Sequence, residues 1–155
     1  MEMIESFRVN HLQLLPGLYV SRRDRLGAAV VTTFDLRFCA PGREPVMDMP
    51  ALHTLEHLGA TYFRNSPLAQ QVVYFGPMGC RTGFYLLLFG NHGAPELYDQ
   101  VLDFCDFVLN FSGPIPGATA AQCGNFSEQN LAMAQYYIRK YRQELCTHRR
   151  FSYPK

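Results

Sequence analysis

The sequence predicts an α+β fold, in which an antiparallel sheet of about four strands packs with three to four helices. Stretches rich in β-branched and aromatic residues predict the strands, and two long segments show the alternating three- and four-residue spacing of buried helix stripes. The strands are not each followed by a helix, which argues against a parallel sheet. With 155 residues, of which 48% are hydrophobic, the chain can bury a full core in a single domain, 1–155.

Charge and cysteine usage exclude several classes of protein. A formal net charge of +1 gives no sign of the large positive charge typical of a nucleic-acid-binding protein or a polybasic membrane patch. The chain lacks an apolar run of about 18 residues and an N-terminal signal-peptide pattern. Five cysteines at irregular spacing argue against a disulfide framework. We therefore expect a cytoplasmic protein with free thiols and with no nucleic-acid or membrane partner. The basic cluster 148–150 is expected to be a solvated tail.

The first half of the chain predicts two extended segments and then a helix. Residues 18–22 have extended character, and residues 28–39, rich in Val, Thr and Phe, predict a strand. A loop with three prolines follows, and its last proline, Pro50, stands where a helix can start. The helix is expected over 51–64.

The middle of the chain predicts a pair of strands around a tight turn. Residues 71–75 and 83–89 have strand composition, and Gly76-Pro77-Met78-Gly79-Cys80 lies between them. Such a short connection favours antiparallel pairing.

Two helices complete the predicted elements. Pro95 opens the first, which ends at Gly113-Pro114, and its buried stripe comprises Leu97, Val101, Phe104, Val108 and Phe111. We interpret Ser127 as the N-cap of the second. The stripe of that helix comprises Leu131, Ala134, Ile138, Tyr141 and Leu145.

The most informative motif is His53-Thr54-Leu55-Glu56-His57 in the predicted helix 51–64. Two histidines four residues apart lie on one face of a helix, so both imidazoles can bind the same metal ion. The carboxylate of Glu56 can move protons at a substrate that the metal polarises. Two histidines are only part of such a site, because catalytic zinc-like centres use three protein ligands and keep one position open.

Two residues compete for the place of the third ligand. The order His-x-x-Glu-His matches inverzincin peptidases, whose third ligand is a distant glutamate, here Glu128. Cys123 would instead give a His, His, Cys site. We favour for Glu128 a position in the first turn of the last helix, where it complements the helix dipole. A small inverzincin-like metallopeptidase and a non-catalytic metal-binding domain are the alternatives to a metal-dependent enzyme of another class.

A second reactive residue stands in the glycine-rich turn. Cys80 is placed where rigid strands present a polar side chain, and a nearby metal ion and Arg81 would favour its thiolate, which can act as acid or base. The alternative interpretation is that Cys80 has no catalytic role and is a small buried residue in a tight turn. The remaining cysteines, Cys39, Cys105 and Cys146, are expected to be core or surface thiols.

Several stretches, in one order over nearly the full length, point to a known family. They are Ser6-Phe7, Asn10-His11, Phe34-Asp35-Leu36-Arg37-Phe38-Cys39, His53-Thr54-Leu55-Glu56-His57, the block from Gly76 to Tyr85, and Gln122-Cys123-Gly124. The Pro-Met-Gly-Cys-Arg-Thr-Gly block together with Gln-Cys-Gly is highly specific. On these motifs the chain resembles the LuxS-type S-ribosylhomocysteine lyases.

The resemblance implies the chemistry of the site. It implies a metal held by His53, His57 and Cys123, one ion per subunit. In the family this metal is Fe(II), and zinc or cobalt can replace it. Glu56 and Cys80 are implied as the paired acid/base groups.

The resemblance also implies substrate contacts and a partner. Ser6, His11 and Arg37 match positions that contact the ribosyl part of the substrate. Arg64 matches a position near the homocysteine end, whose carboxylate it can pair with. The family is a homodimer with its sites at the subunit interface, where Ser6 and His11 reach the partner's site. Many members carry an acidic residue where this chain has Tyr74.

The implied reaction cleaves S-ribosylhomocysteine to homocysteine and 4,5-dihydroxy-2,3-pentanedione, the precursor of the quorum-sensing molecule autoinducer 2. It belongs to the activated methyl cycle. The carbonyl must first migrate along the sugar chain, because the thioether carbon is too far from the aldehyde for direct elimination. The function expected from the sequence is therefore a metal-assisted carbon–sulfur lyase.

Overall fold

Four strands form one antiparallel sheet in the order β1-β2-β4-β3, which confirms the predicted sheet. The structure is a computed structural model that describes residues 2–154, without the side chains of Glu5 and Ser6. The strands are β1 (Gly17–Leu26), β2 (Ala29–Arg37), β3 (Val72–Pro77) and β4 (Gly83–Phe89). The predicted hairpin-like pair is β3 and β4, whereas the insertion of β4 between β2 and β3 was not predicted.

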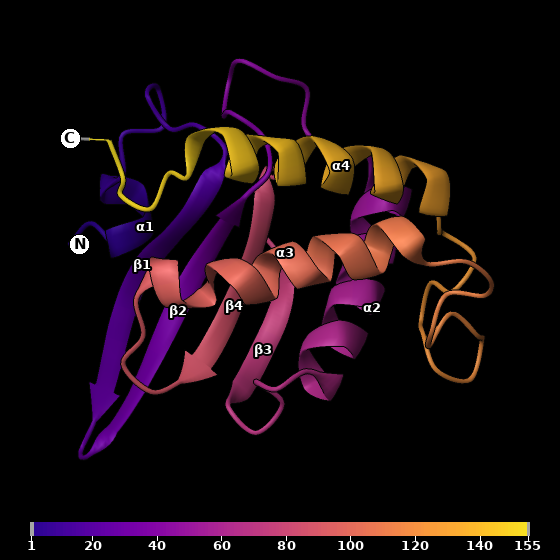
Figure 1. The fold of residues 1–155 in the computed structure, drawn as a ribbon, viewed down its shortest axis with the longest axis horizontal. Coiled ribbons are helices and arrows are strands. Elements are labelled where there is room, and N and C mark those ends of the chain that lie inside the picture. The colour runs from indigo at the N-terminus through magenta and orange to yellow at the C-terminus, as the bar shows by residue number, and fades with distance from the viewer. Residues whose placement is uncertain (1, 155) are drawn as a thin grey trace.

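Three long helices cover one face of the sheet, as Figure 1 shows, which confirms the predicted α+β class. The helices are α1 (Glu5–Arg8), α2 (Met49–Asn65), α3 (Ala94–Asn110) and α4 (Leu131–His148). Helix α2 begins with Asp48 as N-cap and Pro50 in its first turn, which preorganises the start of the helix. It approaches β3 closely because the ring of Phe75 lies against Gly59, where a Cβ atom would overlap the ring.

The start of α4 differs from the prediction. Asn130, not Ser127, caps the helix, and its side-chain oxygen accepts a hydrogen bond of 3.0 Å from the backbone N–H of Met133. Glu128 consequently lies before the helix rather than in its first turn. The predicted stripe of α4 is buried from Ala134 onward, and Leu131 is half-buried.

The segment after α4 is not a solvated tail, contrary to the prediction. Arg149 lies over the ring of Tyr98, 5.0 Å from its centroid. Arg150 donates hydrogen bonds to the carbonyl oxygen of Pro16 (3.0 Å) and to the carboxylate of Glu144 (2.9 Å). The chain therefore continues from α4 along the start of β1, and its C-terminal end lies near the N-terminal end in Figure 1.

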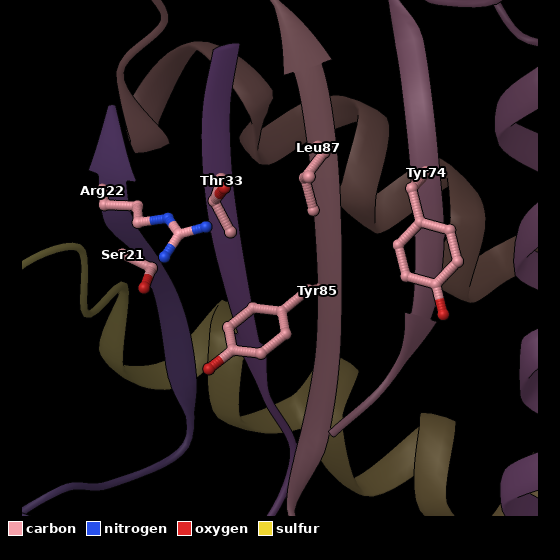
Figure 2. Close-up of a pocket in the computed structure, with 6 residues that line it drawn as sticks. All are labelled: Ser21, Arg22, Thr33, Tyr74, Tyr85 and Leu87. Atoms are coloured by element: carbon pink, nitrogen blue, oxygen red, sulfur yellow. The ribbon is translucent and has the colours of Figure 1, made fainter. Parts of the chain in front are cut away.

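The other face of the sheet is not covered by a long helix. Figure 2 shows six side chains on this face with the helices behind the strands. They line a cavity of about 280 Å³ and are Ser21, Arg22, Thr33, Tyr74, Tyr85 and Leu87. Tyr74 keeps half of its surface exposed (50%).

The cysteines are all free, as predicted. Cys39 and Cys105 are buried in the core and Cys146 is exposed. Burial raises the pKa of the Cys39 thiol to about 11, so this thiol stays protonated at neutral pH. In the part of the chain that the structure describes, no helix combines the length and apolarity that a membrane crossing needs.

Candidate metal centre

Two elements far apart in the sequence bring His53, His57 and Cys123 together. Helix α2 presents both imidazoles, and the segment between α3 and α4 presents the thiol. The Nε2 atoms of the histidines are 3.0 Å apart, and the sulfur of Cys123 is 3.4 Å from Nε2 of His53. The three ligand atoms lie within 4.8 Å of one another, so the group can hold a metal ion.

The hydrogen bonds of the two imidazoles support this reading. Nδ1 of His53 is 2.9 Å from the carbonyl oxygen of Glu128, and Nδ1 of His57 is 2.7 Å from that of Pro116. A carbonyl oxygen only accepts, so each neutral ring carries its proton on Nδ1 and has a lone pair on Nε2. Two such lone pairs repel at 3.0 Å unless a cation lies between them.

The spacing of the donor atoms also fits a metal. Nitrogen and sulfur ligands of one tetrahedral ion, at about 2.0–2.3 Å from it, lie roughly 3.3–3.7 Å apart. The distances of 3.0 and 3.4 Å between the atoms here are close to those values. Two imidazoles and a thiolate are a donor set typical of zinc and iron sites.

Local contacts position the Cys123 segment. The backbone N–H of Cys123 donates to the carbonyl oxygen of Thr119 (2.9 Å), and the N–H of Asn125 lies 3.4 Å from the cysteine sulfur. Gly117 has a φ of +74° and approaches His57 so closely that a Cβ atom would be 3.1 Å from Nδ1. Glycine is favoured at this position because other residues are strained at positive φ.

A buried hydroxyl ties the same segment to α2. Thr54 is fully buried and donates a hydrogen bond of 2.7 Å to the side-chain oxygen of Gln129. It also accepts one of 2.9 Å from the backbone N–H of Asn130. The amide nitrogen of Gln129 lies 3.2 Å from Nδ1 of His53. The motif helix and the segment that carries Cys123 are thus joined directly beside the ligands.

Glu128 does not take the place of the third ligand. Its carboxylate is hydrogen-bonded to the side chain of Asn125, and its backbone carbonyl, not its carboxylate, contacts His53. An inverzincin site needs that carboxylate on the metal. The arrangement of the described residues therefore does not support the metallopeptidase alternative.

Glu56 lies beside the candidate ligands His53 and His57 and faces open space. It lines a cavity of about 180 Å³ together with His53 and Pro77, and a second cavity of about 250 Å³ with His57. Among the side chains that the structure describes, none forms a hydrogen bond or an ion pair with its carboxylate. A carboxylate in this position is available to exchange protons with a ligand in the cavity.

Cys80 lies in the turn after β3 and is exposed. The turn is closed by a hydrogen bond of 2.9 Å from the N–H of Arg81 to the carbonyl oxygen of Met78. Arg81 has a φ of 58°, in the left-handed region, a backbone conformation that strains residues other than glycine. The turn therefore fixes the backbone that carries the thiol at the end of the sheet.

Arg37, rather than Arg81, reaches Cys80. Nη1 of Arg37 is 4.0 Å from the cysteine sulfur and donates a hydrogen bond of 2.6 Å to the hydroxyl of Thr82. That hydroxyl lies 3.1 Å from the same sulfur. Because the hydroxyl accepts from Arg37, its own proton is free to be donated to the sulfur. The guanidinium of Arg37 and the hydroxyl of Thr82 thus both face the sulfur of Cys80.

The other predicted substrate-binding residues lie in two places. His11 and Arg37 line one cavity of about 250 Å³ with Cys80. Arg64 lies apart from them, and its guanidinium donates to the carbonyl oxygens of Val72 (3.4 Å) and Val73 (3.0 Å). The side chain of Ser6 lies outside the described residues.

Sequence reasoning missed four polar residues that organise the site. Asp35 and Thr82 contact Arg37, and Thr54 and Gln129 connect α2 to the segment before α4. Asp35 had a signal, because it stands two residues before Arg37 in an apolar strand and so shares its face of the sheet. Thr54 and Gln129 had none, since their contact joins positions 75 residues apart.

Comparison with known proteins agrees with the resemblance seen in the motifs. A sequence model of the S-ribosylhomocysteinase (LuxS) family matches residues 4–151. A protein of Finegoldia magna named S-ribosylhomocysteine lyase is 55% identical over 91% of this chain and 90% of its own length. Proteins with the same name from Clostridium acetobutylicum (51%; 91% and 90% covered) and Porphyromonas gingivalis (45%; 99% of both chains) are also similar.

Proposed function

Because the chain belongs to the S-ribosylhomocysteinase (LuxS) family, we propose that His53, His57, Glu56, Cys80 and Cys123 carry out its reaction. The protein is a carbon–sulfur lyase that cleaves S-ribosylhomocysteine to homocysteine and 4,5-dihydroxy-2,3-pentanedione. The observation that carries the assignment of the site is the approach of three ligand atoms to within 4.8 Å of one another.

The metal in this proposal is Fe(II), one ion per subunit, held by His53, His57 and Cys123, and zinc or cobalt can substitute for it. When bound, it supplies a Lewis acid for substrate oxygens and no redox step. Fixed imidazole tautomers support this role, because both rings keep their Nε2 lone pairs for the ion.

Glu56 and Cys80 handle the protons. The aldehyde carbonyl of the opened sugar must move from C1 to C2 and then to C3 before the thioether can leave. Each move takes a proton from the carbon next to the carbonyl and returns one to its neighbour, which requires paired acid/base groups. Loss of the C4 proton then expels the homocysteine thiolate by β-elimination. The two donors at Cys80 suit these tasks, and so does the carboxylate of Glu56, which has no partner among the described side chains.

The substrate-binding proposals rest on the cavities. His11 and Arg37 share the cavity of Cys80, which suits binding of the hydroxyl-rich ribosyl part, and Ser6 is proposed to join them. Arg64 is exposed and is proposed to exchange its backbone contacts for the carboxylate of the homocysteine part. The product is proposed to serve as the precursor of autoinducer 2. The free thiols at the site suit a reducing cytoplasm.

We further propose that the protein acts as a homodimer. Among the described residues of the first twelve, four large apolar side chains are exposed: Met3 (60%), Ile4 (53%), Phe7 (71%) and Leu12 (82%). The uncovered face of the sheet adds Tyr74 and Phe89, which are half exposed. Exposed apolar groups in such number are typical of an interface. His11, in the same segment, is proposed to reach the partner's site.

Mixing two inactive variants tests this shared site. His11→Ala and His57→Ala chains, unfolded and refolded together, should regain about a quarter of wild-type activity, because half of the dimers are mixed and each has one intact site. No recovery in dimers shown to be mixed would place His11 in the site of its own chain. Mixing Cys80→Ala with His57→Ala shows in the same way which protomer supplies Cys80.

Thiol release from S-ribosylhomocysteine by anaerobically prepared protein tests the function itself. We expect thiol release, no cleavage of peptides, and loss of both bound metal and activity in Cys123→Ala. Cys146→Ala, which removes an exposed thiol on α4, is the matched control and should retain both. Full metal occupancy in Cys123→Ala would contradict the assignment of the third ligand.

A further inference from the structure

A chain of hydrogen bonds leads from the C-terminal segment to Cys80. The hydroxyl of Tyr153 donates to the carboxylate of Asp35 (2.8 Å). Both oxygens of that carboxylate accept from Arg37, at 3.1 Å from Nε and 2.6 Å from Nη2. The remaining nitrogen of Arg37, Nη1, faces Thr82 and Cys80. Every nitrogen of the guanidinium thus has a partner.

The ion pair at the centre of this chain is buried. The side chains of Asp35 and Arg37 are only 1% and 4% exposed. Burial raises the pKa of Asp35, and the Arg37 guanidinium and the Tyr153 hydroxyl oppose that rise. A buried ion pair depends on each of its hydrogen bonds, because water cannot replace a missing donor.

The C-terminal segment is held firmly enough to supply such a donor. The ring of Tyr153 stacks on that of Tyr19, with centroids 4.7 Å apart. Phe151 packs edge-on against Tyr98 at 5.6 Å. The carbonyl oxygen of Arg150 accepts a hydrogen bond of 3.0 Å from the N–H of Leu18, next to the start of β1. In Figure 1 the segment runs from the end of α4 to this edge of the sheet.

We propose that Tyr153 is a positioning residue for Cys80, acting through Asp35 and Arg37. The inference rests on the proposed role of Cys80 in the lyase reaction. The Tyr153 hydroxyl fixes the carboxylate of Asp35, and the two-pronged pairing with that carboxylate fixes the plane of the guanidinium. The plane directs Nη1 at Thr82 and at the sulfur of Cys80. Through this chain of contacts, Tyr153 helps to position the donors that contact the thiol of Cys80.

The test compares two phenylalanine substitutions in the same stacked pair. Tyr153→Phe removes only the hydroxyl that contacts Asp35. Tyr19→Phe is the matched control, because its hydroxyl donates to the carbonyl oxygen of Leu15 instead (2.9 Å). The rate of alkylation of Cys80 by iodoacetamide at fixed pH, followed by mass spectrometry, is measured against that of exposed Cys146 in the same chain. Metal content, melting temperature and kcat for thiol release are recorded in parallel.

In Tyr153→Phe, we expect the Cys80 to Cys146 alkylation ratio and kcat to fall together, roughly three- to tenfold. This is less than the full effect of a lost hydrogen bond to a charged group, because the hydroxyl acts on Cys80 only through Asp35 and Arg37. Metal content should stay at the wild-type level, and Tyr19→Phe should change neither the ratio nor kcat. An unchanged alkylation ratio in Tyr153→Phe would overturn the proposal, and so would an equal fall in Tyr19→Phe.

The same experiment separates this inference from the proposed function. If wild-type protein releases no thiol but its alkylation ratio still falls in Tyr153→Phe, the lyase assignment fails and the positioning of Cys80 stands. If thiol release is normal and the ratio does not respond, the positioning proposal alone is refuted.

Discussion

Replacing Thr54 by valine should weaken metal binding although Thr54 is not a ligand. The substitution keeps the shape of the side chain and removes two hydrogen bonds of a fully buried hydroxyl, at 2.7 Å to Gln129 and 2.9 Å from the N–H of Asn130. Each hydrogen bond contributes about 1 kcal/mol, so the free energy of unfolding should fall by about 2 kcal/mol. For a chain of this length the melting temperature should fall by roughly 4–8 °C.

The effect on the metal follows from the position of the two bonds. They hold Gln129 against Nδ1 of His53 and anchor the segment that carries Cys123. Loss of contacts behind metal ligands typically lowers metal affinity about 10- to 100-fold. Calorimetric titration of metal-free protein with zinc measures that affinity, and thermal unfolding of the same sample measures stability.

Thr33→Val is the matched control for this substitution. The hydroxyl of Thr33 is also buried but has no hydrogen-bond partner in the described chain, so valine should cost no stability and leave zinc affinity unchanged. If Thr54→Val binds zinc as tightly as the wild type, the proposed anchoring of the Cys123 segment is refuted. An equal loss of affinity in Thr33→Val would refute it as well.

Three further predictions concern stability. Arg81→Gly should raise the free energy of unfolding, measured in urea, by about 0.5–1 kcal/mol, because glycine adopts a φ of 58° without strain. A lower free energy of unfolding would show that Arg81 is not strained. Asn130→Ala should cost about 1 kcal/mol by removal of the N-cap of α4, whereas an equal cost in Ser127→Ala would contradict the assigned start of the helix. Burial raises the pKa of Tyr19 from 10.0 to about 12, so its contribution to stability is complete below pH 10 and is lost as the pH rises towards 12. Tyrosinate absorbance should therefore rise together with unfolding, and titration of all tyrosines near pH 10 in the folded protein would contradict this.

The metal half of the site could be read from the sequence to a large extent. The spacing of His53 and His57 needs only the helix period, and Pro50 marked the start of the helix. The choice of Cys123 over Glu128 could not be settled by local pattern, because it depends on how the segment between α3 and α4 folds back. The structure settles the geometry through contacts such as that of Thr54 with Gln129, between residues distant in the sequence.

The surroundings of Cys80 were less predictable. The turn was visible from its glycines and proline, but the guanidinium at the thiol was assigned to Arg81, its neighbour in sequence. The structure places Arg37 there instead, because antiparallel pairing of β2 with β4 sets Arg37 opposite Gly83. The order of the strands was not predicted, so the contact between Arg37 and Cys80 could not be predicted either. The C-terminal segment was misjudged for a related reason, since its partners Leu18 on β1 and Asp35 on β2 lie more than 100 residues away in the sequence.

Thiol release from S-ribosylhomocysteine by Cys80→Ala, with bound metal measured in the same sample, separates the proposed proton transfer by Cys80 from the proposed metal binding. We expect wild-type metal content and no measurable turnover, because the substitution leaves the proposed ligands His53, His57 and Cys123 untouched and removes the proposed acid/base group. Turnover close to that of the wild type would contradict the role of Cys80 in the reaction.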